Sequence, residues 1–148
     1  MNIERQTSNM TINEIQDEII EEFSFFSDWM EKYEYIIDLG KQLPLIDEQY
    51  KDEDHLIKGC QSRVWLHAGL EGGNVAFTAD SDAVITKGII ALLIRVLSGQ
   101  PAEAVAKSDL YFIDKIGLKE HLSPTRSNGL VSMVKQMKMY GLALHAKN

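Results

Sequence analysis

Hydrophobic positions along this chain recur with two different periods, and each period predicts a different kind of element. Near the start, apolar residues return every three or four positions, which is the spacing of one face of a helix. Thr11 and Glu14 have the spacing of a capping box, so we expect this helix to begin just after Thr11. Its apolar face is formed by Ile12, Ile15, Ile19 and Phe23.

A second helix is predicted to begin at Ser27 or Asp28 and to end around Gly40, because capping residues precede it and a glycine follows its last apolar positions. The stretch 46–55 is charged and has no clear period, so we expect a loop there. The inward positions of the second helix are Trp29, Tyr33, Ile36 and Ile37.

The middle of the chain alternates between apolar and other residues, which is typical of strands with one buried face. Two such runs, 63–68 and 75–80, flank a turn at 71–74, and together they predict a β-hairpin. A short third strand is expected at 57–59. His67 is expected on the exposed face of its strand.

After the hairpin the chain is apolar almost all round, which predicts a buried central helix that runs to about Leu97. Asp80 or Ser81 is expected to cap this helix. Asp82 is expected to enter its first turn, where the helix dipole favours a carboxylate.

Three further helices are expected: a short one from Pro101, another over about 109–116, and a long one opened by Ser123-Pro124, since proline suits a first helical position. The order of elements predicts a single α+β domain over residues 1–148, with a small antiparallel sheet packed against helices. Residues 1–10 are polar, and we expect them to form a flexible N-terminus.

The charge balance narrows the possible partners. The chain carries 22 acidic and 15 basic residues and a net charge of −7, which argues against a basic nucleic-acid-binding face. The longest apolar run, 88–94, meets Arg95 well before the about 20 residues that span a bilayer. The N-terminus has no apolar signal-peptide core. Because one unpaired cysteine suits a reducing compartment, we expect a cytoplasmic protein that binds neither nucleic acid nor membrane.

The single cysteine, Cys60, is the strongest candidate for chemistry. It follows Gly59 and precedes Gln61 and Ser62, where a loop is expected to become a strand. A structural thiol, by contrast, usually lies inside an apolar run. Because Gly59 has no side chain, we expect that another molecule can approach the sulfur closely. A lone cysteine forms no intramolecular disulfide and no multi-cysteine metal site.

Residue types alone leave the role of this thiol open. It is either an inert packing group or a nucleophile, since reactivity depends on exposure and pKa. A cysteine hydrolase would need a histidine base, and spacing singles out no pair of Cys60 with His55, His67 or His121. The histidines also lack the i, i+4 spacing of a helical zinc site, so no metal site is predicted.

Arg126 is the second candidate for a functional side chain. It lies within 123–129, among small polar residues in the first turn of the last predicted helix. A positive charge at a helix N-terminus opposes the helix dipole. We therefore expect Arg126 either to have an anionic partner or to be an ordinary surface charge.

Three ordered segments carry a family resemblance: Gly59-Cys60-Gln61-Ser62 followed by Val64-Trp65, the run 79–91, and the run 122–130. Together with 29–43, they resemble the SufE family of sulfur-acceptor proteins over nearly the whole chain from about Ile19. The resemblance implies the α+β sandwich that this family shares with iron–sulfur scaffold proteins of the IscU type. Such a scaffold holds its cluster with several cysteines, whereas this chain has one.

The resemblance also implies a reaction. Family members accept sulfane sulfur from a cysteine desulfurase that carries pyridoxal phosphate, and deliver it to an assembly complex. The expected partners are thus a SufS-like desulfurase and a SufBCD-like scaffold, and this chain would need no cofactor and have no independent turnover. By match to the family motif Cys60 is the persulfide acceptor, supported by Gly59, Gln61, Ser62, Asp82 and Arg126. A rival interpretation is a non-catalytic regulator that only binds the desulfurase.

Two of the supporting residues have specific expected roles. Asp82 is expected to help hold the Cys60 loop in a closed position. Arg126 is expected close to that loop. There it would either favour the anionic thiolate or persulfide of Cys60, or bind a carboxylate such as that of Asp82.

Overall fold

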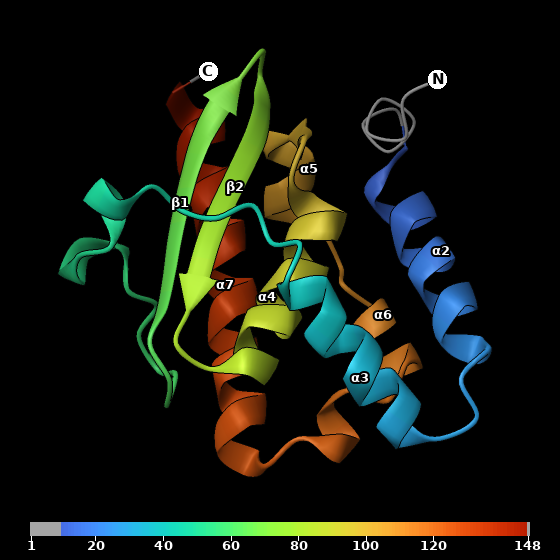
Figure 1. The fold of residues 1–148 in the computed structure, drawn as a ribbon. Coiled ribbons are helices and arrows are strands. Elements are labelled where there is room, and N and C mark those ends of the chain that lie inside the picture. The colour runs from blue at the N-terminus through green and yellow to red at the C-terminus, as the bar shows by residue number, and fades with distance from the viewer. Residues whose placement is uncertain (1–9, 148) are drawn as a thin grey trace.

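The computed structural model describes residues 10–147 and shows helices packed around a small antiparallel sheet (Figure 1). The α+β class predicted from the sequence is therefore confirmed. In chain order, with η denoting a 3₁₀ helix, the elements are α2 (Ile12–Ser24), α3 (Trp29–Gly40), η1 (Glu48–Tyr50), η2 (Glu53–His55), β1 (Val64–Glu71), β2 (Asn74–Ser81), α4 (Val84–Leu97), β3 (Gln100–Pro101), α5 (Ala102–Lys107), α6 (Phe112–Lys115), η3 (Lys119–His121) and α7 (Pro124–Lys147).

The first two helices begin where their caps predict. The hydroxyl of Thr11 accepts a hydrogen bond from the Glu14 amide, and the Glu14 carboxylate accepts one from the Thr11 amide. At the start of α3, the carboxylate of Asp28 accepts a hydrogen bond from the Glu31 amide. Of the expected flexible segment, residues 1–9 lie outside the described residues. Met10 is described, and its carbonyl accepts a hydrogen bond from a buried glutamine, Gln100.

The predicted hairpin is present. β1 and β2 pair antiparallel from Val64↔Ser81 to Glu71↔Asn74. Gly72 and Gly73 connect them with φ of 60° and 85°, the left-handed conformations that a two-residue hairpin turn requires.

The prediction of a third strand at 57–59 was wrong. The strand that completes the sheet is β3, which pairs with the hairpin's second strand through Val75↔Gln100. Near 57–59 the chain makes only an isolated bridge, from Leu56 to Trp65, and then turns at Gly59. Gly59 has a φ of 93°, so the backbone leaves the extended conformation that a strand needs.

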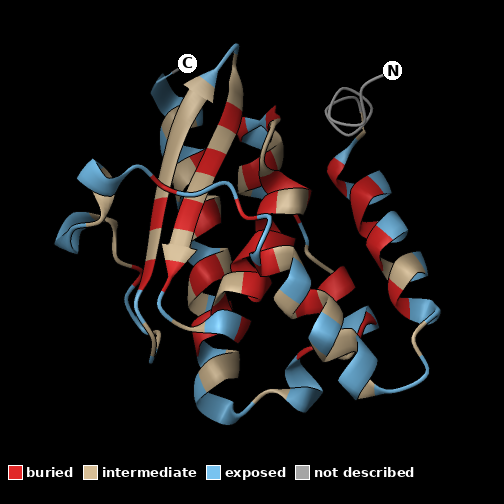
Figure 2. Cartoon of the chain, in the orientation of Figure 1, coloured by how far each residue is buried: buried red, intermediate tan, exposed pale blue. Residues whose placement is uncertain are grey.

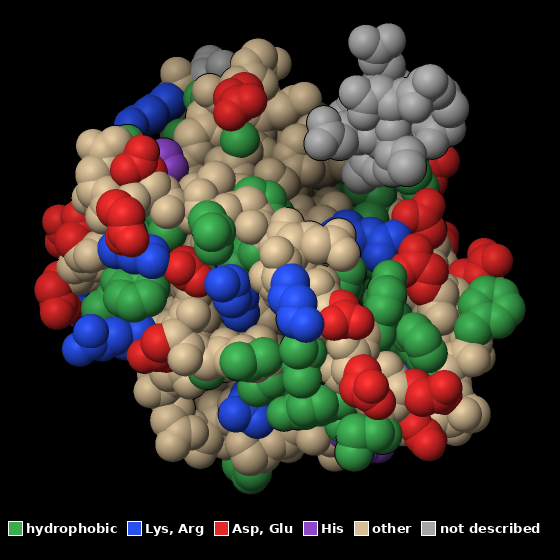
Figure 3. All heavy atoms as spheres, in the orientation of Figure 1, with side chains coloured by type: hydrophobic (Ala, Val, Ile, Leu, Met, Phe, Trp, Pro, Cys, Tyr) green, Lys and Arg blue, Asp and Glu red, His purple; other side chains and the backbone are tan. Residues whose placement is uncertain are grey.

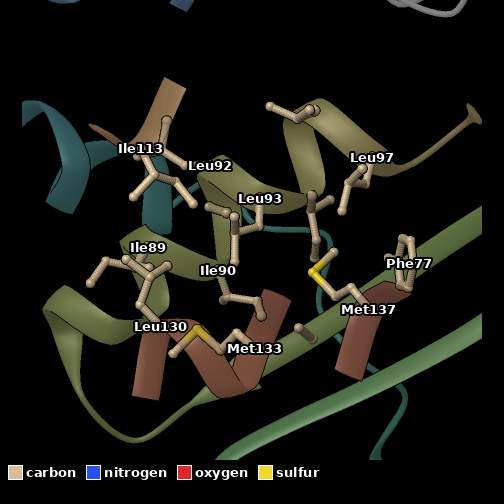
Figure 4. Packing of buried hydrophobic residues seen from close by; sticks show 14 of the residues in the cluster. Phe77, Ile89, Ile90, Leu92, Leu93, Leu97, Ile113, Leu130, Met133 and Met137 are labelled. Carbon is tan, nitrogen blue, oxygen red and sulfur yellow. The ribbon is translucent and has the colours of Figure 1, made fainter. Parts of the chain in front are cut away.

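Helix α4 lies at the centre of the molecule, in contact with β2, α2, α3 and α7. Its residues are buried almost all round (Figure 2). Figure 4 shows α7 packing Leu130, Met133 and Met137 among the buried side chains of α4. Burial of this kind is the main stabilising contribution, about 1.5–3 kcal/mol for each large apolar side chain.

The start of α4 differs from the prediction. Its N-cap is Ala83, which makes no side-chain capping bond, and Asp82 precedes the helix instead of entering it. Asp80 forms ion pairs with Lys51 at 2.7 Å and Lys87 at 3.3 Å. Because β2 continues to Ser81, these polar side chains hold the hairpin and its neighbours and do not cap the helix.

The segment 46–55 is more ordered than the expected loop, since it contains η1 and η2. Its Tyr50 ring stacks on His67 with centroids 3.9 Å apart and planes 7° apart. The prediction that His67 lies on an exposed face was therefore wrong: an aromatic ring covers it, and the residue is only partly exposed. Next to it, Lys51 Nζ lies 5.5 Å from the centre of the Trp65 ring.

The C-terminal helices follow their sequence signals with one change of length. The helix expected over 109–116 is the shorter α6, Phe112–Lys115. α7 opens at Pro124 as predicted, and the hydroxyl of Ser123 accepts a hydrogen bond from the Arg126 amide at 3.2 Å. None of the helices between residues 10 and 147 has the length and apolar character needed to cross a membrane.

The surface is unevenly charged. Figure 3 shows acidic side chains gathered along the side of the molecule formed by α2, whose sequence carries Glu14, Asp17, Glu18, Glu21 and Glu22. Arg95 of α4 reaches this side and pairs with Glu18 and Glu22, each at 2.6 Å. These ion pairs join α2 to the central helix.

Candidate functional site

Cys60 lies in a short loop that leads into β1. The amide of Ile57 donates a hydrogen bond of 2.8 Å to the carbonyl of Val64, which closes the loop at its base. The thiol is half-buried. The entry into β1, the start of α4 and the first turns of α7 lie at the same end of the molecule (Figure 1), and residues from all three border the loop.

The nearest partner of the thiol is the backbone of α7. Cys60 Sγ donates a weak hydrogen bond to the carbonyl oxygen of Gly129 at 3.6 Å. A Cβ atom at position 129 would make an ordinary contact of 3.4 Å with the sulfur, so any side chain longer than that of alanine would meet the loop. Gly129 was missing from the predicted site residues. The signal that could have found it is a glycine inside a helix, which costs about 1 kcal/mol relative to alanine.

Gly59 also faces α7. Its φ of 93° is left-handed, and a Cβ atom there would lie 2.5 Å from Ser132 Oγ. The expectation that Gly59 leaves room for another molecule was thus wrong for this conformation, because Ser132 of the same chain takes the space. The glycine instead lets the loop lie against the helix.

Asp82 and Ser81 fasten the other end of the loop. Asp82 Oδ1 accepts a hydrogen bond from the Arg63 amide at 3.1 Å, and the Asp82 amide donates to the Arg63 carbonyl at 3.3 Å. The Ser81 hydroxyl donates to the same carbonyl at 2.8 Å. Asp82 therefore contacts the end of the loop, and its expected role in holding the loop closed requires such a contact.

A cavity of about 20 Å³ lies beside the thiol. A space of this size holds about one water molecule and is too small for an organic substrate. Of the predicted site residues, Asp82 and Gly59 lie outside its walls. The cavity is lined by Cys60, Gln61, Ser62, Thr86, Thr125, Arg126, Gly129 and Met133.

Burial raises the pKa of the Cys60 thiol above its ordinary value. The resting thiol is accordingly protonated at neutral pH, since the ordinary cysteine pKa is already about 8.5. Within residues 10–147, Arg126 forms no ion pair with Asp82. Arg126 does line the cavity beside Cys60, so it lies close to the loop as expected, and its effect on an anionic sulfur stays a prediction.

The candidate histidine bases lie elsewhere. His55 Nδ1 lies 2.7 Å from Asp52 Oδ1, His67 stacks on Tyr50, and His121 stacks on Trp29 with centroids 4.2 Å apart. None of the three lines the cavity beside the thiol. Across residues 10–147, no group of three or more His, Cys, Asp or Glu side chains is placed to hold a metal ion.

Comparison with known proteins gives consistent matches. The family model SufE, described as an Fe-S metabolism associated domain, matches residues 17–141. An uncharacterised SufE-like protein of Rhizobium etli is 43% identical over 127 residues, covering 82% of this chain and 86% of that protein. A second, from Rhizobium meliloti, is 40% identical over 127 residues, covering 82% and 91%.

A plant relative and a solved structure extend the comparison. SufE-like protein 1, chloroplastic/mitochondrial, of Arabidopsis thaliana is 40% identical over 131 residues, which are 88% of this chain but 35% of that longer protein. The solution structure of a hypothetical protein from Thermus thermophilus matches with a TM-score of 0.75 at 21% identity, covering 90% of this chain and 97% of the other. At that identity the likeness shows a shared fold.

Proposed function

Because this chain belongs to the SufE family, we propose that it accepts sulfur from the persulfide of a pyridoxal-phosphate cysteine desulfurase onto Cys60 and passes it on to iron–sulfur cluster assembly. The observation that carries the proposal is the half-buried thiol beside an atom-sized cavity. We propose a SufS-like desulfurase as donor and a SufBCD-like scaffold as recipient. The proposed location is a reducing cytoplasm, which suits a lone thiol.

The proposed reaction follows thiol–disulfide exchange. The thiolate of Cys60 attacks the outer sulfur of the donor's persulfide. The sulfur–sulfur bond of the donor breaks, a new one forms on Cys60, and the proton lost from Cys60 is balanced by one taken up on the donor's thiolate. No net oxidation occurs. The recipient's nucleophile later takes the outer sulfur and returns Cys60 to a thiol.

The closed conformation of the Cys60 loop suits the storage of a bound sulfur better than nucleophilic attack by the thiol. Burial raises the pKa of the Cys60 thiol, which disfavours the thiolate that exchange requires. The loop therefore has to move outward when a donor binds, and the breakable contacts are those to Gly129 and from Asp82 to Arg63. When the loop recloses, the small cavity has room for about one atom beyond the thiol. That space would shelter the outer sulfur from reductants and oxidants.

Other residues that line the cavity also suit the outer sulfur of a persulfide. Arg126 lines it, and a guanidinium is always charged, so it would stand beside the anionic outer sulfur. Gln61 and Ser62 line the same space and supply polar groups. A hydrolase has less support, because the cavity is too small for a substrate and no described histidine lines it.

The test is a mass measurement. The purified chain is incubated with a SufS-like desulfurase and cysteine, and its intact mass is recorded without reductant. The proposal expects the mass of one added sulfur atom on wild type and none on Cys60→Ser. Cys60→Ser should also lose stimulation of desulfurase turnover under limiting reductant. If the serine variant still stimulates, the chain is a non-catalytic regulator and the sulfur-acceptor role is wrong.

A further inference from the structure

α7 borders a second and much larger hollow, on the side away from the Cys60 loop. This groove has a volume of about 540 Å³ and lies between α7 and the segment that runs from α5 through α6 to η3. Its apolar lining comes from both walls and includes Leu110, Ile113, Val131, Val134, Met139 and Leu142. We call it the α6–α7 groove.

The groove gathers exposed apolar side chains. Val131, Met139 and Leu142 are 50%, 53% and 62% exposed, and they are three of the seven large hydrophobic residues exposed among those described. Single exposed apolar residues are ordinary, whereas several in one hollow mark a binding surface. These three share one wall, on α7.

Charged side chains edge the groove. Lys119, Lys135 and Lys138 line it, together with Asp109 and Asp114. Among the described residues, none of these five side chains takes part in an ion pair. The rim therefore carries one net positive charge from three lysines and two aspartates, on a chain whose net charge is −7. Such a rim attracts an acidic partner more strongly than the rest of this surface does.

The length of the groove matches a helix. Its α7 wall extends from Leu130 to Leu142, which at a rise of 1.5 Å per residue is about 18 Å, or a little over three helical turns. An amphipathic helix binds such a groove through apolar residues at i, i+3, i+4 and i+7. Acidic residues on the edge of that helix would meet the lysines of the rim.

The groove and the thiol lie on opposite sides of α7. Gly129 contacts Cys60, and Lys138 lines the groove. These two residues are nine positions apart, or about two and a half helical turns, so they lie on opposite faces of α7. Occupation of the groove consequently leaves the Cys60 loop uncovered.

We infer that the α6–α7 groove is a docking site for an amphipathic helix with an acidic edge, presented by a partner protein that can bind while Cys60 is engaged elsewhere. The inference does not depend on the proposed sulfur transfer. A second copy of this chain does not offer its acidic helix α2 for this purpose, because the apolar face of α2 is already buried against its own core.

The test uses two synthetic helical peptides and fluorescence anisotropy at low salt. Both peptides carry leucines at i, i+3, i+4 and i+7; one has glutamates along the edge and its twin has lysines. The acidic peptide is expected to bind wild type at least about tenfold more tightly than the basic twin, equivalent to about 1.4 kcal/mol. Combining Lys135→Glu with Lys138→Glu should reverse this preference.

Two further variants distinguish binding in the groove from non-specific binding to exposed hydrophobic residues. Leu142→Glu adds a charge in the groove at an exposed position and should abolish binding of both peptides. Leu45→Glu is the matched control, because Leu45 is similarly exposed, at 59% against 62%, and does not line the groove. It should bind as wild type does. Equal binding of the two peptides, binding of neither, or a loss shared by Leu45→Glu would overturn the inference.

Amide chemical shifts locate the bound peptide. The acidic peptide should shift amides of α6 and α7 that face the groove and leave the alkylation rate of Cys60 unchanged. If dodecanoate shifts these amide signals to saturation while the acidic peptide does not, the groove binds a small amphiphile and the inference is wrong. It is equally wrong if wild type sediments as a dimer that Leu142→Glu converts to a monomer.

Discussion

The sulfur of Cys60 lies 3.6 Å from the carbonyl oxygen of Gly129, a residue 69 positions later in the chain. This contact holds the loop against a helix through a backbone acceptor, so no substitution of an acceptor side chain can remove it. What a substitution can change is how closely the helix approaches, and Gly129 and Gly59 control that distance from the two sides.

Gly129→Ala is expected to raise the free energy of unfolding by up to about 1 kcal/mol, because alanine is the better helix former and its Cβ would make an ordinary contact of 3.4 Å with the sulfur. Gly129→Leu extends past that contact and should push the loop outward. Denaturant unfolding and the rate of Cys60 alkylation by iodoacetamide measure the two effects. A leucine variant that alkylates no faster than the alanine variant would contradict the close packing.

Gly59→Ala is expected to destabilise the fold by about 1–3 kcal/mol, the range for a non-glycine residue in a strained backbone conformation. Gly99→Ala is the matched control, because Gly99 also has positive φ, 83°, but a Cβ there meets nothing within 4 Å. Gly59→Ala should therefore lose more than Gly99→Ala in denaturant unfolding. Adding Ser132→Ala should recover the difference; if it does not, Ser132 is not the obstacle.

Asp82→Ala is expected to free the end of the Cys60 loop. The variant loses the hydrogen bond that Arg63 donates to the carboxylate at 3.1 Å, which is worth about 0.5–1.5 kcal/mol. Hydrogen exchange of the Arg63 amide and alkylation of Cys60 should both become faster, as they should in Asp82→Arg. Asp82→Asn keeps an acceptor oxygen and should stay near wild type. If Cys60 is alkylated at the same rate in Asp82→Ala as in wild type, Asp82 does not help to hold the loop closed.

Arg126→Ala is expected to leave the pH dependence of Cys60 alkylation where it is. Burial, and not a neighbouring charge, is the cause that raises the pKa of the Cys60 thiol. The alkylation midpoint of folded wild type should lie above that of the unfolded chain in denaturant, and the variant should show the same midpoint. A midpoint that rises in Arg126→Ala would mean that the guanidinium already stabilises the thiolate in the closed loop.

His67 should make the fold weaker in mild acid. Burial, together with the nearby His55, lowers the pKa of the His67 imidazole. The unfolded chain then binds the proton more readily, so stability is full above about pH 6.5 and is lost as the pH falls below it. Melting temperatures between about pH 7.5 and about pH 5.5 measure the loss. His67→Phe keeps a ring against Tyr50 and should reduce it, whereas exposed His145→Ala should not.

The sequence was informative wherever a few neighbouring residues decide the structure. The capping pair Thr11 and Glu14, the turn at Gly72-Gly73 and the start at Ser123-Pro124 each act within about four residues, and each was predicted correctly. Alternation in the hairpin also gave the buried face, because a one-residue shift would expose Val64 and Leu66.

What the sequence could not give depends on packing between distant segments. Gln100 is polar and follows a helix-breaking glycine, yet it pairs with Val75 because α4 brings it back beside the hairpin. Asp82 has the sequence features of a carboxylate in the first turn of a helix, but in the fold its carboxylate accepts a hydrogen bond from the Arg63 amide. Gly129 looked like part of a family motif, and only the fold shows that its carbonyl faces the thiol.

The hydrogen bond between Ile57 and Val64 makes the Cys60 loop a short tether. While that bond of 2.8 Å stays closed, the Cα atom of Cys60 is three virtual bonds of about 3.8 Å from that of Ile57, and so remains within about 11 Å of it. In the sulfur transfer proposed above, a protein whose reactive atom lies deeper than this reach, at the bottom of a rigid shaft, would not exchange sulfur with Cys60. For that proposed transfer, the length of the tether would select partners by the depth of their reactive centre, and any longer movement would have to come from the partner.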